Sequence, residues 1–468
     1  MLPNFKSKYF ISIILIFFIK INYLFTELIS FPFKTINWKK NSSYDYISTI
    51  YSNELYTNLK LGSLETKLVP AIISHNEIAF SIDECSYNLK NSTNYNESSL
   101  PWSRSFVWEK IEKGILFEDL LYVNAKKEHD KNIKEKFFNT KFIYVENRNA
   151  SYIGLNFPDL YEHNVISIFK TLKDNKLIDN YEWCPIINKN RKNKYIDYND
   201  IDGELIIGGN YSHYQPEIFD EKYITNFEMN SHGQYVEYTI KFQDIYVGDQ
   251  QDKNSLYYKQ VYFGLNFLTI GSLEYETKIA NLFFNDLIEK QICYVKPMDI
   301  FPEVHYYYCK RLSDLDKKFD INLFPKLCLL NKNISFCFRG DDLFIEDPNN
   351  KDILYFTIGF MKFDPVDDFP KYFHFGIQFL SKYQLCFDPK NKIIAYYGFK
   401  EEYNPKKKSK SYSYIIYISI IVILAIILFS LGMLLQKKLT KIPRKIRANE
   451  LNDDDFLYEK KECDLPIN

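Results

Sequence analysis

Two apolar runs bracket the chain, and between them hydrophobic residues occur in short segments of strand length. The second run, residues 415–435 (IIYISIIVILAIILFSLGMLL), contains 21 residues and no charge. At about 1.5 Å rise per residue a helix of this length is roughly 30 Å long, which matches the hydrocarbon thickness of a bilayer. It is longer and more uniformly apolar than a typical core helix. We therefore expect a transmembrane helix at 415–435.

The first apolar run, residues 10–19 (FISIILIFFI), follows Lys6 and Lys8 and is too short to span a bilayer comfortably. Its length and basic flank are typical of the hydrophobic core of a signal peptide. We assign residues 1–26 to that peptide. No Ala-x-Ala-like cleavage site follows, so the alternative is a retained signal anchor. Both alternatives export the middle of the chain.

The charges around the second run set the expected orientation. Basic residues flank it on both sides and are more numerous after it: Lys406, Lys407, Lys408 and Lys410 precede it, and Lys437, Lys438, Lys441, Arg444, Lys445 and Arg447 follow it. By the positive-inside tendency the C-terminus is cytoplasmic. We expect a single-pass type I membrane protein of the secretory pathway or cell surface, with a lumenal or extracellular ectodomain, a basic linker at 401–414 and a cytoplasmic tail at 436–468. Residues 453–458 (DDDFLY) of the tail are interpreted either as a sorting signal or as a solvated acidic segment.

Six Asn-x-Ser/Thr sequons lie between the two apolar runs, and none lies in the tail. They begin at Asn41, Asn91, Asn96, Asn149, Asn210 and Asn333. This distribution supports a glycoprotein whose ectodomain is exported.

Cysteine usage favours disulfide bonds over a metal site. Seven of the eight cysteines fall in the expected ectodomain: Cys85, Cys184, Cys293, Cys309, Cys328, Cys337 and Cys386. There is no Cys-x-x-Cys pair and no close pair of histidines, so we expect neither a metal nor another cofactor. Five of the seven lie in the second half, where we expect bridges to concentrate. Cys85 and Cys184 are left either to pair with each other or to stay separate, and the odd number leaves at least one thiol outside the intramolecular pairs.

Charge and composition exclude some partners. The formal net charge is −1 over 468 residues, and no basic patch is interleaved with aromatic residues. Nucleic acid is therefore not an expected partner. Aromatic residues make up 18% of the chain, which indicates a large folded ectodomain rather than a glycosylated stalk.

The hydrophobic pattern of the ectodomain predicts a mainly β fold. Short segments rich in Tyr, Ile, Phe and Val, separated by Asn, Asp, Lys and Gly, predict strands at 55–61, 114–123, 141–145, 205–207, 235–242, 334–338, 353–360 and 393–397. Spacing of three and four residues predicts two short helices, at 160–175 and 280–290. Charged segments at 124–136 and 188–198 are expected to be loops.

Several segments resemble landmarks of the pepsin-like aspartic proteases (peptidase A1 family), in the family's order. Residues 203–209 (GELIIGG) resemble the family's GELxxGG turn, and residues 152–158 (YIGLNFP) resemble its ILGLGFP segment. Residues 114–123 resemble the strand that leaves the active-site flap. Residues 375–380 (FGIQFL) and 387–396 (FDPKNKIIAY) resemble the family's final motifs. The resemblance covers about residues 45–400. It implies a bilobal fold with lobes at 27–210 and 211–400, anchored by one C-terminal transmembrane helix as in the β-secretase type.

The resemblance also implies a catalytic pair of aspartates, one in an Asp-Thr/Ser-Gly turn of each lobe. No such turn occurs in the chain. Counting from neighbouring motifs places the first turn at Ile73, Ser74 and His75. The second count falls on Gly271, Ser272 and Leu273. The flap tyrosine falls at Val107, beside Trp108. Since neither turn supplies a carboxylate, the proton-sharing mechanism of this class is not expected.

Other candidates for chemistry are interpreted as structural. The carboxylates of Asp83, Asp119, Asp364, Asp367 and Asp368 do not fall where the two turns should meet. Ser74 and His75 are neighbours in a strand and should point to opposite faces, which disfavours a nucleophile-base pair. His305 and Cys309 are interpreted as a packed histidine and a disulfide cysteine.

The sequence therefore predicts a catalytically inactive homologue of these proteases that binds a peptide or protein ligand in the cleft between its lobes. The first alternative is an active membrane-bound aspartic endopeptidase with divergent catalytic loops. The second is a structural or adhesive surface protein that makes no use of the cleft.

Overall fold

The described part of the chain is built mainly of β-sheet. The structure is a computed structural model. It describes residues 27–37, 44–75, 80–88, 98–103, 113–127, 133–145, 150–156, 166–188, 198, 200–209, 214, 219–229, 238–248, 250–251, 260–311, 319–331, 334–361 and 373–399.

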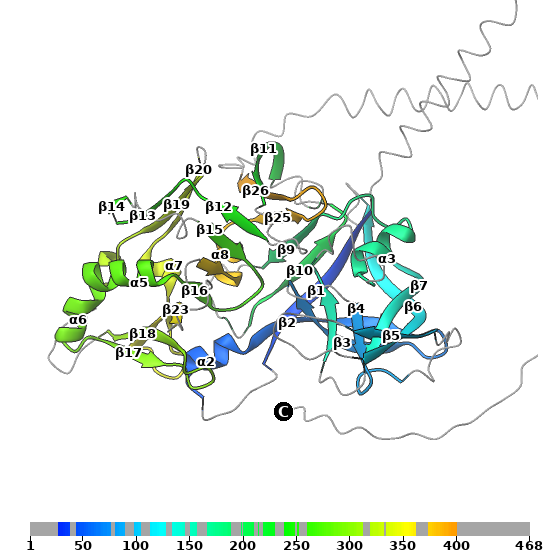
Figure 1. Cartoon of the computed structure of the whole chain (residues 1–468), viewed down its shortest axis with the longest axis horizontal. Helices are drawn as coiled ribbons and strands as arrows, with labels where there is room; N and C mark the ends of the chain where they lie inside the picture. Colours follow the sequence, from blue (N-terminus) through cyan, green and yellow to red (C-terminus); the bar gives the residue numbers. More distant parts are fainter. Residues whose placement is uncertain are drawn as a thin grey trace, which may run out of the picture. The chain divides into compact units, whose positions relative to one another are not determined.

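The largest sheet runs through strands from both halves of the chain. Its order is β11-β26-β25-β9-β10-β1-β2-β3-β8-β4-β7-β6-β5, and β6 also pairs with β1 and β2. Its strands are β1 (Glu27–Asn37), β2 (Asn53–Leu61), β3 (Lys67–Ser74), β4 (Phe80–Asp83), β5 (Ser98–Ser103), β6 (Lys113–Lys127), β7 (Ile133–Val145), β8 (Ser151–Gly154), β9 (Trp183–Ile187), β10 (Asp202–Ile207), β11 (Phe219–Glu228), β25 (Leu385–Asp388) and β26 (Ile393–Phe399). Figure 1 shows the orange strands β25 and β26 alongside green β9 and β11.

Two further sheets come from the second half of the chain. The larger has the order β12-β15-β24-β16-β23-β18-β22-β21, with β17 paired to β18, and the smaller has the order β14-β13-β19-β20. Their strands are β12 (Thr239–Lys241), β13 (Asp244–Val247), β14 (Gln250–Gln251), β15 (Gln260–Phe263), β16 (Thr269–Gly271), β17 (Cys293–Pro297), β18 (Val304–Lys310), β19 (Leu327–Asn331), β20 (Ile334–Phe338), β21 (Phe344–Glu346), β22 (Ile353–Phe356), β23 (Ile358–Met361) and β24 (Phe373–Phe375).

The helices are short, and side chains cap several of them. They are α2 (Tyr46–Tyr51), α3 (Ile168–Asp174), α5 (Leu273–Ile279), the π-helix η2 (Ala280–Phe284), α6 (Asn285–Glu289), the 3-10 turn η3 (Ile321–Leu323), α7 (Gly340–Leu343) and α8 (Ile377–Lys382). The side chains of Asp45, Ser167 and Ser272 accept backbone N–H groups in the first turns of α2, α3 and α5. These bonds satisfy donors that a helix start leaves without a partner in the helix.

Alternation of buried and more exposed positions explains why the chain forms these strands. In β2 every second side chain from Asn53 to Leu61 is buried, which is the period of two expected for a strand with one face on the core. The same core joins the two halves of the chain. Trp183 stacks on Phe387 with ring centroids 4.3 Å apart, and the edge of Tyr238 packs against both rings.

Most of the predicted elements coincide with observed ones, with three corrections. The predicted strand 353–360 is interrupted at Thr357 and forms β22 and β23. Most of the segment 124–136 is not a loop, because β6 continues to Lys127 and β7 starts at Ile133 in a long antiparallel hairpin. The predicted helix 160–175 is observed as the shorter α3, which starts at Ile168 after its N-cap Ser167, and residues 160–165 lie outside the described part.

Residues up to Phe399 belong to one compact unit. Strands from both sides of the expected boundary at residue 210 share the largest sheet, so the two expected lobes are joined by pairing as well as by the chain. Residues 1–26, 415–435 and the six sequon asparagines lie outside the described residues. Among the described residues, none of the helices is long and apolar enough to cross a bilayer.

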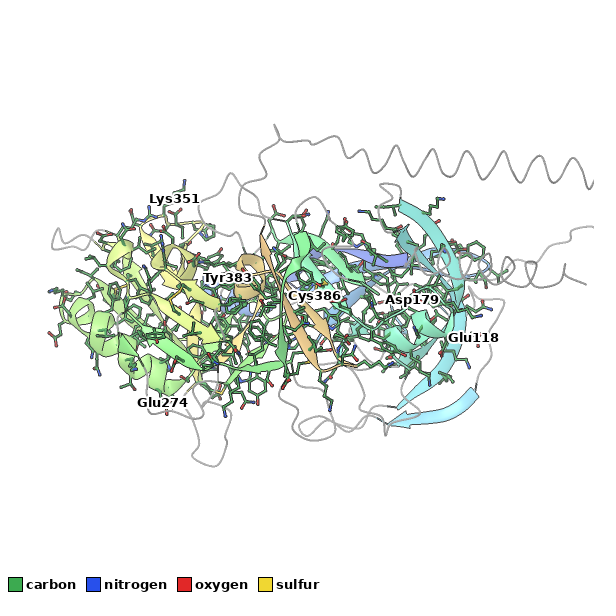
Figure 2. The ribbon with its side chains drawn as sticks, turned by 90° about the horizontal axis from the view of Figure 1, so that it is seen from above. Glu118, Asp179, Glu274, Lys351, Tyr383 and Cys386 are labelled. Atoms are coloured by element: carbon green, nitrogen blue, oxygen red, sulfur yellow. A yellow bond between two sulfur atoms is a disulfide. The ribbon has the colours of Figure 1, made fainter. Side chains whose placement is uncertain are left out.

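Three disulfide bonds are present, as the cysteine pattern predicts, but their pairing corrects one expectation. Cys293 bonds to Cys309 and Cys328 to Cys337 within the second half. Cys184 bonds to Cys386 across 202 residues of sequence, and it therefore does not pair with Cys85. Figure 2 labels Cys386, whose bridge ties β25 to β9. Cys85 is exposed and is not part of these three bridges.

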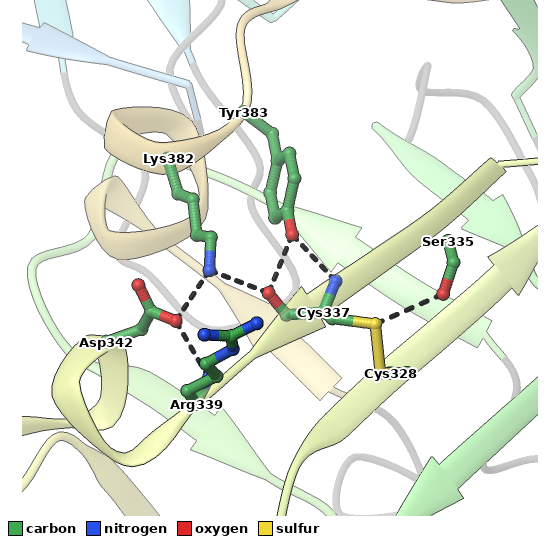
Figure 3. The surroundings of a disulfide bond; sticks show 7 residues. All are labelled: Cys328, Ser335, Cys337, Arg339, Asp342, Lys382 and Tyr383. Atoms are coloured by element: carbon green, nitrogen blue, oxygen red, sulfur yellow. Dashed lines mark hydrogen bonds and ion pairs between the residues drawn. A yellow bond between two sulfur atoms is a disulfide. The ribbon is translucent and has the colours of Figure 1, made fainter.

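The Cys328–Cys337 bridge closes the hairpin of β19 and β20, which is held against the end of α8 (Figure 3). The hydroxyl of Tyr383 accepts the N–H of Cys337 at 2.6 Å and donates to its carbonyl at 2.7 Å. The ammonium of Lys382 donates to the same carbonyl and pairs with Asp342. The position of α8 is thereby fixed at its C-terminal end.

Candidate functional site

Two pairs of parallel strands end next to each other, one from each half of the chain. In the first pair, β3 lies beside β8, with Ile73 opposite Ile153 and Ser74 opposite Gly154. In the second pair, β15 lies beside β24, with Phe263 opposite Phe375. Each pair thus ends where one of its strands runs into a glycine.

Backbone hydrogen bonds close both ends in a similar way. In the first pair, the N–H of Leu155 donates to the carbonyl of Ser74 at 2.8 Å. In the second, the N–H of Gly264 donates to the carbonyl of Phe375 at 2.9 Å, and the N–H of Ile377 donates to that of Asn266 at 2.8 Å. A Cβ on Gly376 would lie 1.8 Å from that last carbonyl, so glycine is required there.

His75 connects the two strand ends directly. The backbone N–H of Leu265 donates to its Nδ1 at 3.0 Å, across a sequence separation of 190 residues. Because Nδ1 accepts, the neutral ring carries its proton on Nε2. The Nε2 edge of the imidazole packs over Gly264, since a Cβ added to that glycine would lie 2.3 Å from Nε2. Burial and the neighbouring His374 lower the pKa of His75 to about 4, so the ring is neutral at pH 7.

A pocket of about 410 Å³ lies at this junction. It is lined by Tyr51, Ser52, Asn53, Glu54, Leu55, Ile72, Ile73, Ser74, His75, Leu265, Asn266, Leu268, Ile270, Ile300, Met361 and His374. Aliphatic side chains and polar groups contribute to this lining in about equal number, and the volume falls within the range of small-ligand pockets.

Helix α2 and the turn before β18 form a wall of the pocket and are bonded to each other. The N–H of Asp45 donates to Asp299 at 2.8 Å, and the N–H of Asp299 donates to the hydroxyl of Ser48 at 2.9 Å. The ring of Tyr51 stacks on that of Phe301. These contacts join residues about 250 positions apart and hold the wall across both halves of the chain.

The charges of the pocket limit the chemistry it can perform. Among its lining residues Glu54 is the one carboxylate, and the two strand ends carry Ser74 and Gly264. Acid-base activation of water by an aspartic pair needs two carboxyl groups that share a proton. The lining therefore suits binding, with Nε2–H of His75 and the amide of Asn266 as polar groups.

The structure brings only one of the two predicted turns to the pocket. Ile73, Ser74 and His75 line it. Residues 271–273, the second predicted turn, do not line it. Gly271 ends β16 and packs on Phe360, Ser272 is buried as the N-cap of α5, and Leu273 is the first residue of that helix. The segment that contacts His75 is 264–266, seven residues earlier.

The remaining candidates lie elsewhere or outside the described part. Asp119 is fully buried and accepts the hydroxyl of Tyr87, and Asp83 is buried with its pKa raised by that burial. His305 bonds to Glu276 at 2.6 Å, while Cys309 is in a disulfide, so these two do not form a catalytic pair. Val107, Trp108, Asp364, Asp367 and Asp368 lie outside the described residues.

Of the lining residues, Ile73, Ser74 and His75 alone were predicted, and Leu265, Asn266 and His374, which lie at the second pair of strand ends, were among those missed. A usable signal was present, because the apolar strand residues 260–263 run directly into a glycine, as residues 373–375 do before Gly376. The second turn was located by counting back from the helix expected near residue 279, on the assumption that only a short segment separates the turn from that helix. The segment is longer because it contains β16, so the count ended inside it.

Comparison with known proteins adds no family to this geometry. No family model matches the chain, and a search of the curated proteins finds no match.

Proposed function

We propose that the ectodomain is a pepsin-like, bilobal protein without protease activity that binds an extended peptide or protein segment in the pocket between its halves. The observation that carries this proposal is the pair of parallel strand ends, β3 with β8 and β15 with β24, which meet through His75 and Leu265. Each includes a motif by which the sequence resembles the aspartic proteases, residues 152–158 and 375–380.

The lining supports a peptide ligand better than a highly charged one. Aliphatic residues such as Ile73, Leu268 and Ile270 provide apolar surface, and Glu54 is the one carboxylate among the lining residues. Polar groups of His75 and Asn266 lie at the same place and can bond the main chain of an extended segment. Affinity should therefore come from main-chain hydrogen bonds and apolar contacts, with little dependence on salt.

A membrane-anchored, glycosylated ectodomain fits this proposal. The apolar runs at 10–19 and 415–435 and the distribution of sequons support export with one C-terminal span. The disulfides support an oxidising compartment. The binding site would then face the lumen or the cell exterior.

A tryptophan substitution that fills the pocket tests the proposal. The side chain of Asn266 is exposed at the pocket, and only its backbone carbonyl is bonded to Ile377, so Asn266→Trp should fill the site and leave the strand ends intact. Asn58→Trp is the matched control, because Asn58 is equally exposed on β2 and is not a lining residue.

The measurement is retention of peptides from a random library by the immobilised full-length chain in detergent, read by mass spectrometry. We expect the unmodified chain and Asn58→Trp to retain the same peptides, and Asn266→Trp to lose them by at least tenfold in affinity. Equal retention by both variants, or no retention by any of the three proteins, would overturn the proposal.

A further inference from the structure

The single hydrogen bond between His75 and the N–H of Leu265 joins the two walls of the pocket through a group that can be protonated. Nδ1 of a neutral imidazole accepts this bond, but a protonated imidazole carries hydrogen on both ring nitrogens and can only donate. Protonation of His75 would thus place two N–H groups against each other at a donor-acceptor distance of 3.0 Å. From this geometry we propose that His75 is an acid-labile latch, which holds the two halves of the pocket together at neutral pH and releases them in acid.

The ring cannot avoid this conflict by a small shift. Its Nε2 and Cε1 edge packs over Gly264, where even one added carbon would lie 2.3 and 2.6 Å from those atoms. Rotation of the ring by a half turn would exchange the two nitrogens, but the protonated ring presents N–H on either side. The N–H of Leu265, which is buried, would then lose its acceptor.

Three titratable groups line the pocket with His75. His374 on β24 opposes a proton on His75 by like-charge repulsion, and Glu54 on β2 is the carboxylate of the lining. The phenol of Tyr51 on α2 is neutral across the range concerned, because burial raises its pKa. The combined effect of burial and of His374 lowers the pKa of His75 to about 4 in the closed state.

The sign of the effect follows from the difference between closed and open states. A solvated histidine has a pKa of about 6.5, so the open state binds a proton more readily than the closed state. Above about pH 6.5 both states are neutral and the latch is fully effective. As the pH falls to about 4, the ratio of open to closed states rises by about 150-fold, and only below pH 4 does it approach about 300-fold, the ratio that this pKa difference represents.

Hydrogen exchange of the amide of Leu265 reports the latch directly, without any ligand. We would measure exchange by mass spectrometry in peptides covering 260–268, using the full-length chain in detergent between pH 7.5 and 4 and correcting for the intrinsic pH dependence of exchange. Peptides covering 140–145, in β7 far from any described histidine in sequence, provide the internal reference.

The proposal expects protection of Leu265 to fall by between about 30- and 150-fold as the pH drops to 4, while the reference segment keeps its protection. His75→Asn is the matched variant, because the amide oxygen of asparagine can still accept the N–H but does not titrate. It should keep Leu265 protected throughout the range. His305→Asn, which removes a histidine bonded to Glu276 instead, should behave like the unmodified chain.

Three outcomes would overturn the latch. They are constant protection of Leu265 in the unmodified chain, an equal loss of protection in the reference segment, and the same loss in His75→Asn. If His75→Asn fails to fold, the titration of the unmodified chain still decides, because a transition centred outside the interval from about pH 4 to 6.5 excludes His75. These outcomes are independent of whether the pocket binds peptides.

Discussion

At the scale of single residues, a histidine and a glycine define the junction on which the pocket depends. The imidazole of His75 takes its place only because Gly264 has no side chain, and the N–H of Leu265 is then within hydrogen-bond distance. The junction contains this hydrogen bond but no carboxyl group at the strand ends, because Ser74 is the residue at the end of β3 and Gly264 follows the end of β15. The proposed binding and the proposed lack of protease activity therefore rest on the same few residues.

The substitution Gly264→Ala tests this junction. The new methyl group would lie 2.3 Å from Nε2 of His75 and should displace the ring from Leu265, with a cost of about 1 to 3 kcal/mol in unfolding free energy. The measurement is urea denaturation of the full-length chain in detergent. In a His75→Ala background the same change should cost much less, because the conflicting ring is gone. An equal cost in both backgrounds would contradict the proposed contact.

At the scale of elements, disulfides and caps fix strands that the sequence places far apart. The bond between Cys184 and Cys386 joins β9 to β25, whereas the bond between Cys328 and Cys337 only closes a hairpin whose strands already pair. Helix α2 is short, and its stability depends on contacts between its first residues and Asp299. Such elements depend on tertiary partners more than on local propensity.

The two bridges should therefore differ in their effect on stability. In the chain-entropy account, a bridge that closes a loop of 202 residues raises the free energy of unfolding by about 5 kcal/mol. A bridge that closes a loop of 9 residues raises it by about 2.5 kcal/mol. We expect the pair Cys184→Ala and Cys386→Ala to lower the unfolding free energy by about 2 to 3 kcal/mol more than the pair Cys328→Ala and Cys337→Ala.

Denaturant titration of both double variants under non-reducing conditions measures the difference. Cys85→Ala is the control and should leave the midpoint unchanged, because Cys85 is exposed and outside these bridges. A larger loss from the hairpin bridge would show that the long bridge does not restrict the unfolded chain as assumed.

The elements also show how far the sequence could predict the fold. Short apolar runs located β2, β6 and β20, each of which buries one face, and also β26, in which the consecutive residues Ile394 and Ala395 are both buried. It missed α2, which is too short to establish a helical period. It also predicted a loop where β6 and β7 continue as a hairpin, since their charged residues lie on strands with exposed faces.

The site was predictable only in part, for a related reason. Residues 73–75 were located because only a short stretch, along β3, separates them from the nearest recognisable motif. They do line the pocket. The second strand end was placed seven residues too late, because β16 intervenes between residue 266 and α5. Disulfide pairing was not predictable either, since spacing alone does not tell which strands lie side by side.

At the scale of the whole molecule, the largest sheet and the pocket both combine the two halves of the chain. Strands β25, β26 and β11 extend the sheet that β9 and β10 begin, and Tyr238 donates its buried hydroxyl to the carbonyl of Leu155 next to the pocket strands. The halves are therefore built around a shared interface. The account holds that this interface binds but does not cleave.

Incubation of the full-length chain with a proteome-derived peptide library from about pH 3 to 8, with new peptide termini identified by mass spectrometry, tests that claim most directly. We predict no new termini at any pH, because the described lining offers Glu54 and no second carboxylate with which it could share a proton. New termini that disappear with a transition-state mimic of the aspartic class, or with Glu54→Gln, would contradict the account and favour the alternative of an active endopeptidase.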